Sequence, residues 1–241
     1  MQISEFPADC ERHGAYTARR MGDYTTRCPA CAEEQRAAEE QRRRMRDQQV
    51  SRRHWLVRAL SEAGIPAKFA AARMAQLEAP FAHRVRVWVD AATAGKSSGP
   101  LVLAGSVGVG KSHAAAAAMR AWIVRARQAA RYTTASDYSA VVRDCWRRDA
   151  DQSESRVEQR HAEVALLVLD DLGAGRAIDS EILQGLISAR YAAGRLATTI
   201  ISTNIAPAGF DAAFGERVAD RLREGATLIT CAGKSRRRPA C

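Results

Sequence analysis

Eight consecutive residues in the middle of the chain have the types and spacing needed to bind phosphate. They follow the pattern G-x-x-x-x-G-K-S and are Gly105, Ser106, Val107, Gly108, Val109, Gly110, Lys111 and Ser112, with His113 directly after them. Glycines allow a tight turn that presents backbone N–H groups to phosphate oxygens. We expect Lys111 to reach the β- and γ-phosphates of ATP and the Ser112 hydroxyl to ligate Mg²⁺.

The elements that must position this loop are also visible in the sequence. An apolar run from residue 101 predicts a strand before the loop, and an alanine-rich stretch predicts a helix that begins at Lys111. The positive end of that helix dipole would face the bound phosphates. A glycine-rich turn that matches the pattern by chance is the alternative, and the flanking strand and helix weigh against it.

Two carboxylates follow a second apolar run, residues 166–169. Four apolar residues in a row suit a parallel strand that is buried on both faces, and ligands bind at the carboxyl ends of such strands. We expect Asp170 to hold the Mg²⁺ shell and Asp171 to orient the attacking water. A leucine-rich strand ending in two aspartates is weak evidence alone, but it becomes specific after a phosphate-binding loop.

Three further polar residues come later in the chain. A β-branched strand over residues 198–203 is followed by Asn204, which could bond the γ-phosphate or the attacking water, or could simply cap a turn. Arg217 and Arg221 lie four apart on one face of a predicted helix. One could pair locally while the other acts on the phosphate of a neighbouring molecule; two surface ion pairs are the alternative.

Four metal-ligating residues stand near the N-terminus: Cys10, His13, Cys28 and Cys31. Two short chelating pairs with fourteen residues between them match a tetrahedral zinc site, and thiolates with one imidazole select Zn²⁺ over hard cations. Protein would fill all four positions, so the site would be structural, with the intervening segment as a loop. The alternative is a redox C-x-x-C with an unrelated His, for which the strand-to-helix context is missing.

Composition restricts the class of protein. The 241 residues include 46% hydrophobic residues, without an apolar run long enough for a membrane span and without a signal pattern, so we expect a cytoplasmic protein that does not bind membranes. The net charge of +10 favours a nucleic-acid partner, although a generally basic proteome would give the same balance. Cys145, Cys231 and Cys241 are scattered and are expected to be incidental thiols.

The chain divides into three predicted segments. Residues 1–34 form a zinc-binding head, and residues 35–63 form a helical linker with acidic and basic side chains three to four apart. That helix either docks on a partner or is a solvated tether. Residues 64–241 form the nucleotide-binding domain, an α/β fold with a parallel sheet flanked by helices. Residues 68–94, before the first strand, are predicted to be helical.

Taken together, the motifs over about residues 64–238 resemble AAA+ ATPases of the DnaC-type helicase-loader and IstB-type transposition-helper group. The matching motifs are Gly64-Ile-Pro66, Gly105 to His113, Tyr132-Thr-Thr134, Leu169 to Gly173, Arg190-Tyr191, Ser202-Thr-Asn204, Gly215 to Leu222 and Gly233 to Arg237. The resemblance implies that Asn204 is the sensor-1 residue and that Arg221 is a trans-acting arginine finger, with Arg217 one turn earlier. It implies a cis sensor at Arg237, with Arg236 in place of the usual Tyr.

The resemblance also implies function. A zinc-binding head joined to this ATPase is similar to phage or mobile-element helicase loaders, in which ATP governs ring opening and release. Asp171 is one methylene shorter than the Glu common in AAA+ proteins, which predicts slow ATP hydrolysis that acts as a switch. The implied partners are a hexameric replicative helicase, single-stranded DNA bound partly along residues 136–162, and further copies of the chain across ATP-bridged interfaces. An IstB-like helper of a DNA transposase is the main alternative. A small-metabolite kinase and a zinc-dependent regulator with vestigial ATP binding are weaker ones, since neither accounts for all the motifs.

Overall fold

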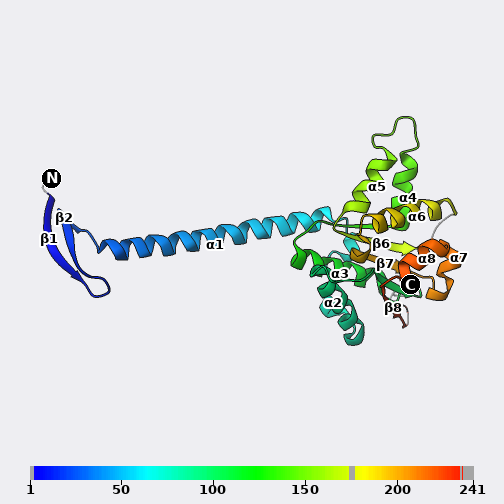
Figure 1. The fold of residues 1–241 in the computed structure, drawn as a ribbon, viewed down its shortest axis with the longest axis horizontal. Coiled ribbons are helices and arrows are strands. Elements are labelled where there is room, and N and C mark those ends of the chain that lie inside the picture. Colours follow the sequence, from blue (N-terminus) through cyan, green and yellow to red (C-terminus); the bar gives the residue numbers. More distant parts are fainter. Residues whose placement is uncertain (1–2, 174–176, 234, 236–241) are drawn as a thin grey trace, which may run out of the picture. The chain divides into compact units, whose positions relative to one another are not determined.

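The computed structural model describes residues 3–173, 177–233 and 235 and divides into two compact units, Met1–Trp55 and Leu56–Cys241 (Figure 1). We describe each unit by itself. Within the described ranges, none of the helices has both the length and the apolar character that a membrane span requires. The cytoplasmic location stays a prediction.

The first unit begins with a small antiparallel sheet in the order β1-β2-β3, made of Ile3–Cys10, Gly14–Met21 and Tyr24–Thr25. The prediction of a loop between the two chelating pairs is therefore wrong, because β2 and β3 occupy most of it. The alternation in β2 explains the strand: Tyr16 and Ala18 share one face, and Ala18 is completely buried. Gly14 and Gly22 supply the positive φ values, 75° and 58°, of the two turns.

Helix α1 (Pro29–Glu62) confirms the long exposed helix expected from the charge pattern. None of its 34 residues is buried. Pairs four residues apart support it, among them Arg44 with Glu40 and Arg58 with Glu62. Gly64, at φ 72°, lies just beyond its end, where a left-handed residue commonly stops a helix.

The second unit contains a five-stranded parallel sheet in the order β5-β6-β7-β4-β8, with helices packed against it. Its strands are β4 (Leu101–Gly105), β5 (Ala130–Thr134), β6 (Leu166–Leu172), β7 (Thr199–Thr203) and β8 (Thr227–Cys231). Its helices are α2 (Ala79–Thr93), α3 (Lys111–Ala126), α4 (Ala135–Asp144), α5 (Glu154–Glu163), α6 (Ala177–Ala192), α7 (Phe210–Phe214) and α8 (Glu216–Arg223), with 3₁₀ turns η1 (Ala67–Phe69), η2 (Met74–Gln76), η3 (Leu196–Thr198) and η4 (Pro207–Gly209). The expected fold class is confirmed.

The sheet forms the core of this unit because its central strands are apolar on both faces. All five residues of β7 and the first five of β6 are buried. Helix α3 packs against β4, β6 and β7, and α4 packs against β6. The carboxyl ends of β4, β6 and β7, which are neighbours in the sheet, therefore lie along the same edge, where ligands bind in such folds.

The segment before the sheet differs from its prediction. Residues 68–94 are not one helix: η1 and η2 are single 3₁₀ turns, and only α2, from Ala79, is a regular helix. Pro80 lacks an N–H and is tolerated in the first turn of a helix but not in its interior, so α2 starts beside it. Leu77 and Glu78 are extended, which separates α2 from the preceding turn.

Candidate nucleotide site and metal cluster

The phosphate-binding pattern forms the turn between β4 and α3. Gly108 and Gly110 have φ values of 85° and 102°, which favour glycine. A Cβ on Gly105 would lie 2.2 Å from the backbone oxygen of Cys231, so β8 leaves no room for a side chain there. Helix α3 begins at Lys111 as predicted, and its N-cap residue, Gly110, has no side chain to bond the first N–H groups. This end of α3 is therefore suited to an anion.

Lys111 and Asn204 come together at the head of this turn. The Lys111 side chain is almost completely buried, and its Nζ donates to the carbonyl oxygens of Gly105 (2.8 Å) and Ser106 (2.9 Å). The same ammonium donates to Oδ1 of Asn204 at 2.6 Å, which links the end of β7 to the loop. These acceptors are neutral, so a phosphate oxygen would be a stronger partner for Lys111.

Asp170 is held by two hydroxyl groups. Its carboxylate is buried, with Oδ2 accepting from the Tyr132 hydroxyl at 2.6 Å and Oδ1 accepting from Ser202. The Ser112 side chain lies close enough to the Tyr132 phenol to lower its pKa slightly, so this phenol is near both residues expected to hold Mg²⁺. Burial, together with the nearby Asp170 and Asp171, raises the pKa of Tyr132 well above its ordinary value, and the phenol therefore stays protonated.

Asp171 occupies a different environment from Asp170. It lines the cavity beside the loop, and its backbone N–H donates to Ser202 Oγ at 3.0 Å. The pairing of β6 with β7 is irregular between Leu169 and Leu172, and Asp171 has φ 55°. The irregularity turns one carboxylate inward to the hydroxyl groups and the next one toward the cavity. The two adjacent aspartates thus have separate surroundings.

The cavity has a volume of about 860 Å³ and is large enough for a nucleotide. Its polar lining includes the loop, Ser112, Asp171 and Asn204. The sequence analysis missed a second, largely apolar group in the lining, which includes Phe69, Leu77, Pro80, Phe81, Arg84 and Ile229. The ring of His113 meets that of Phe69 edge-on, with 6.3 Å between centroids. The sequence signal that could have indicated these lining residues is the pair of aromatic residues, Phe69 and Phe81, in the proline-containing segment before β4.

Arg217 and Arg221 are not among the described residues that line this cavity. Arg221 donates to Ser188 Oγ at 2.6 Å and lies over the ring of Tyr191, 4.7 Å from its centroid, while Arg217 is exposed on the same helix. Arg237 lies outside the described residues. Ser235 contacts the loop, since a Cβ on Gly108 would lie 2.1 Å from its Oγ.

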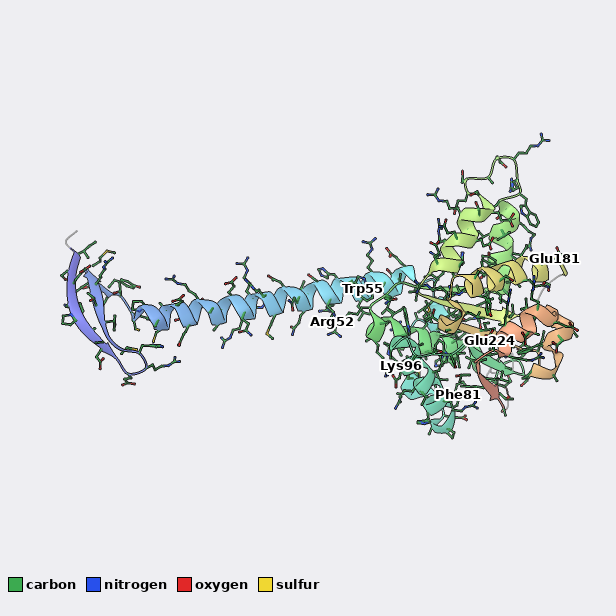
Figure 2. All side chains as sticks on the ribbon, viewed as in Figure 1. Arg52, Trp55, Phe81, Lys96, Glu181 and Glu224 are labelled. Carbon is green, nitrogen blue, oxygen red and sulfur yellow. The ribbon has the colours of Figure 1, made fainter. Side chains whose placement is uncertain are left out.

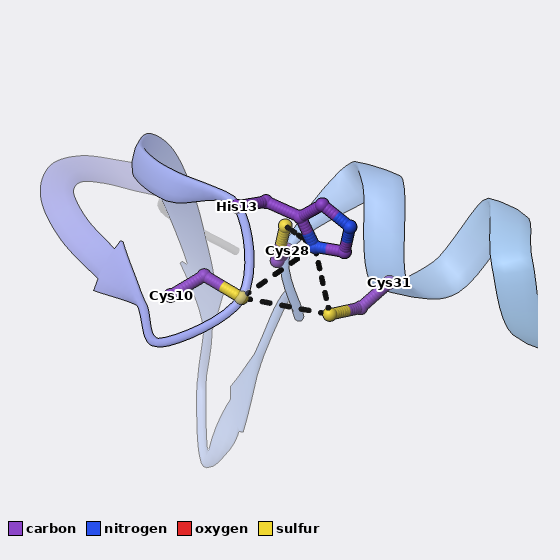
Figure 3. A group of neighbouring side chains, drawn as sticks. All are labelled: Cys10, His13, Cys28 and Cys31. Carbon is purple, nitrogen blue, oxygen red and sulfur yellow. Dashed lines mark hydrogen bonds between the residues drawn. The ribbon is translucent and has the colours of Figure 1, made fainter.

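The four N-terminal cysteine and histidine residues converge, as Figure 3 shows. Their ligand atoms all lie within 4.8 Å of one another. The sulfurs of Cys10 and Cys31 are 3.5 Å apart, and His13 Nδ1 lies 3.3 Å from Cys31 Sγ and 3.8 Å from both Cys10 Sγ and Cys28 Sγ. A tetrahedral zinc centre with Zn–S distances of about 2.3 Å places its ligand atoms about 3.5–3.8 Å apart. The donor set and its spacing therefore fit Zn²⁺.

The contact between His13 and Glu34 and the shifted pKa values of two cysteines also suit this cluster to a metal ion. His13 Nε2 lies 3.0 Å from Oε1 of Glu34, the outer partner that metal-bound histidines commonly have. Hydrogen bonds from the Arg12 backbone and from His13 lower the pKa of Cys10 to about 6, whereas the bond to Cys10 raises the pKa of Cys31 to about 11. The cluster thus favours one thiolate even without a cation.

These features define an ATP-binding protein of the P-loop class with an AAA+ α/β core. More particularly, the chain belongs to the family described as IstB-like ATP binding protein, which matches residues 87–240. A comparison with curated proteins finds no match.

Among solved structures, the crystal structure of the DnaC helicase loader is similar with a TM-score of 0.60 and 22% identity, covering 69% of this chain and 100% of that one. The structure of DnaI has a TM-score of 0.60 and 19% identity, covering 75% and 100%. The replication initiator DnaA bound to AMPPCP and single-stranded DNA has a TM-score of 0.57 and 17% identity, covering 70% and 51%. At these identities the likeness shows the fold.

Proposed function

We propose that this chain is an ATP-dependent loader that delivers a hexameric replicative helicase to single-stranded DNA. Its ATP-binding family includes IstB-like proteins, so the nucleotide site by itself does not separate a loader from a transposition helper. The observation that carries the loader assignment is the N-terminal unit, where Cys10, His13, Cys28 and Cys31 converge ahead of the ATPase. Likeness in fold to the DnaC helicase loader supports the same assignment.

The residues of the nucleotide site have distinct roles in this proposal. Lys111 exchanges its carbonyl and Asn204 partners for the β- and γ-phosphates, and Asn204 becomes free to orient the attacking water. Asp171 accepts a hydrogen bond from that water and is aimed by the irregular end of β6. The base of the nucleotide packs against apolar residues of the cavity lining, among them Phe69 and Phe81.

Ser112 and Asp170 would hold Mg²⁺, and a hydroxyl with a carboxylate suits this hard cation. When bound, Mg²⁺ neutralises charge on the β- and γ-phosphates. Tyr132 keeps its proton and holds Asp170 in place.

Arg221 completes the site of a neighbouring copy in the assembled form. That role requires it to leave Ser188 and the Tyr191 ring, both of which are contacts within one molecule. We therefore expect Arg221→Ala to bind ATP normally and to hydrolyse it more slowly, whereas Lys111→Ala should lose nucleotide binding. If Arg221→Ala hydrolyses ATP at the normal rate at all protein concentrations, Arg221 does not act on the site of a neighbouring copy.

The zinc cluster organises a head that, with the linker, contacts the helicase. For this purpose we keep the division into residues 1–34, 35–63 and 64–241 as functional segments. A hydrogen bond from His13 to Glu34 ties the cluster to α1, so the metal would fix the start of the linker.

The test is to mix the purified chain with the hexameric helicase of its host and to measure complex mass by light scattering, with and without ATP. A stable complex whose mass depends on nucleotide supports the loader. The Lys111→Ala variant should form a complex that no longer responds to ATP. If the parent chain forms no complex with the helicase under any nucleotide condition, the loader function is excluded.

A transposition helper is the second candidate, because the family match is to IstB-like proteins. It predicts ATP-dependent filaments on duplex DNA and no complex with the helicase. Electron microscopy of the chain on duplex DNA with ATP would separate the two functions.

A further inference from the structure

The charged residues of α1 are not spread evenly around the helix. Between residues 41 and 54 the chain has six arginines and one acidic residue. Three of them, Arg42, Arg46 and Arg53, are spaced four and seven residues apart, and at about 100° per residue they lie within about 40° of one another around the axis. We name these three residues the arginine stripe. It covers about 16 Å of helix at about 1.5 Å per residue.

The arginine stripe is not neutralised by its own helix. The carboxylates of Glu40, Asp47 and Glu62 lie about 140–200° around the axis from Arg42, and they bond Arg44, Arg43 and Arg58 respectively. Within the described ranges, no carboxylate lies within 4.0 Å of the guanidinium groups of the stripe.

Charge pairing on one side of α1 thus leaves a cationic line on the other. The carboxylate nearest to the stripe around the axis is Glu39, whose Oε1 accepts from Gln35 at 2.8 Å. All three arginines of the stripe are exposed, and the side chains of α1 stand away from the helix along its length (Figure 2).

The rest of this helix surface limits the kind of partner. Met45 and Val50 are exposed, 58% and 48%, but they lie on opposite sides of the stripe and do not form an apolar face. A partner helix, or a lipid surface into which the helix inserts, would need such a face. Before Trp55, α1 also contains no tyrosine, phenylalanine or tryptophan on which an unpaired base could stack. A straight row of guanidinium groups without aromatic residues instead matches the phosphate backbone of a duplex.

We propose that the arginine stripe of α1 binds the phosphate backbone of duplex DNA. This contact is separate from the single-stranded path along the ATPase and does not rest on the loader assignment. It is independent of sequence, because guanidinium groups that bond phosphates read no base.

The test compares two triple variants of the full chain that lose the same charge. R42Q/R46Q/R53Q removes the stripe, and R43Q/R44Q/R58Q removes three ion-paired arginines from the other side of the same helix. Fluorescence anisotropy measures binding to a labelled 20-base-pair duplex of mixed sequence and to one of its strands, from low to moderate salt. Far-UV circular dichroism checks that both variants keep α1.

We expect the slope of log K against log salt to fall in magnitude by about 2.7, as for three phosphate contacts, so the stripe variant should bind the duplex roughly 500-fold more weakly than the parent near 0.1 M salt if the two are equal at 1 M. The control variant should bind the duplex with nearly the affinity and the salt dependence of the parent chain. Equal losses in both variants, or no loss in the stripe variant, would overturn the proposal, as would a loss confined to the single strand. Sedimentation of the same variants with phosphatidylserine vesicles is a further readout: a loss there with duplex binding unchanged would overturn the proposal and assign the stripe to an anionic membrane surface. The helicase-complex assay on the same preparations reports separately on the loader function.

Discussion

Replacing Tyr132 with Phe removes one hydroxyl from the centre of the site while keeping the ring. This hydroxyl donates to the buried Asp170 at 2.6 Å. A hydrogen bond to a charged group contributes about 1.5–3 kcal/mol, and this substitution leaves no large cavity to add to that loss. For a domain of this size 1 kcal/mol corresponds to about 2–4 °C, so the Tm of Tyr132→Phe should fall by about 3–12 °C.

The assay is thermal unfolding of the full chain without nucleotide and in a buffer without added Mg²⁺, followed by secondary-structure signal. The dependence on pH gives a second check. The pKa of Tyr132 is raised above the unfolded value of about 10, so its contribution is complete below pH 10 and declines as the pH rises further. The difference in Tm between the parent and Tyr132→Phe should therefore be constant from pH 7 to 9 and become smaller above pH 10.

Tyr138→Phe is the matched control. Tyr138 is equally buried in the same unit, and no hydrogen bond of its hydroxyl is found among the described residues. Its Tm should change by less than about 1 °C, because losing an unpaired hydroxyl is nearly neutral. If Tyr132→Phe unfolds within about 1 °C of the parent, or if both variants fall equally, then Tyr132 does not stabilise Asp170 and the proposed role in holding that carboxylate is wrong.

Three further predictions concern the zinc cluster, Arg190 and His161. Cys28→Ser should lose the bound zinc that atomic absorption detects in the parent, whereas Cys145→Ser should retain about one ion per chain; equal zinc in both would contradict the cluster. Arg190 is buried and bonds five backbone carbonyls and Thr199, so Arg190→Met should lower the Tm by about 8–16 °C, or about 4 kcal/mol, while the surface change Arg125→Met should shift it by less than about 2 °C. Burial and nearby arginines lower the pKa of His161 to about 4. Stability should therefore fall by about 3 kcal/mol as the pH drops from 6.5 toward 4. Melting curves of His161→Gln should depend less on pH over that range, and parallel curves would disprove the assignment.

The sequence was sufficient where one local pattern dictates both element and chemistry. The turn between Gly105 and Lys111 needs glycine at left-handed positions and a helix directly after it, and both are found. The apolar run of β6 predicted a strand buried on both faces. These features depend on neighbouring residues, so no knowledge of the rest of the fold was required.

Features that depend on distant contacts were not predicted. Tyr132 looked like a strand residue, and only the pairing of β5 with β6 brings its hydroxyl to Asp170. The residues from Phe69 to Leu77 have an apolar pattern like that of a helix, but these two side chains line the cavity and the backbone forms separate turns. In the head, alternation over a few residues was too short to identify β2 until its pairing with β1 was visible.

The left-handed backbone at Asp171 restricts which acid can evolve there. Among residues with a side chain, aspartate and asparagine tolerate this conformation best, because a short polar side chain can bond its own backbone. Glutamate is one methylene longer and lacks that advantage. We therefore expect Asp171→Glu to be accommodated only if the end of β6 moves. The irregular strand end thus restricts which acid can face the cavity at this position.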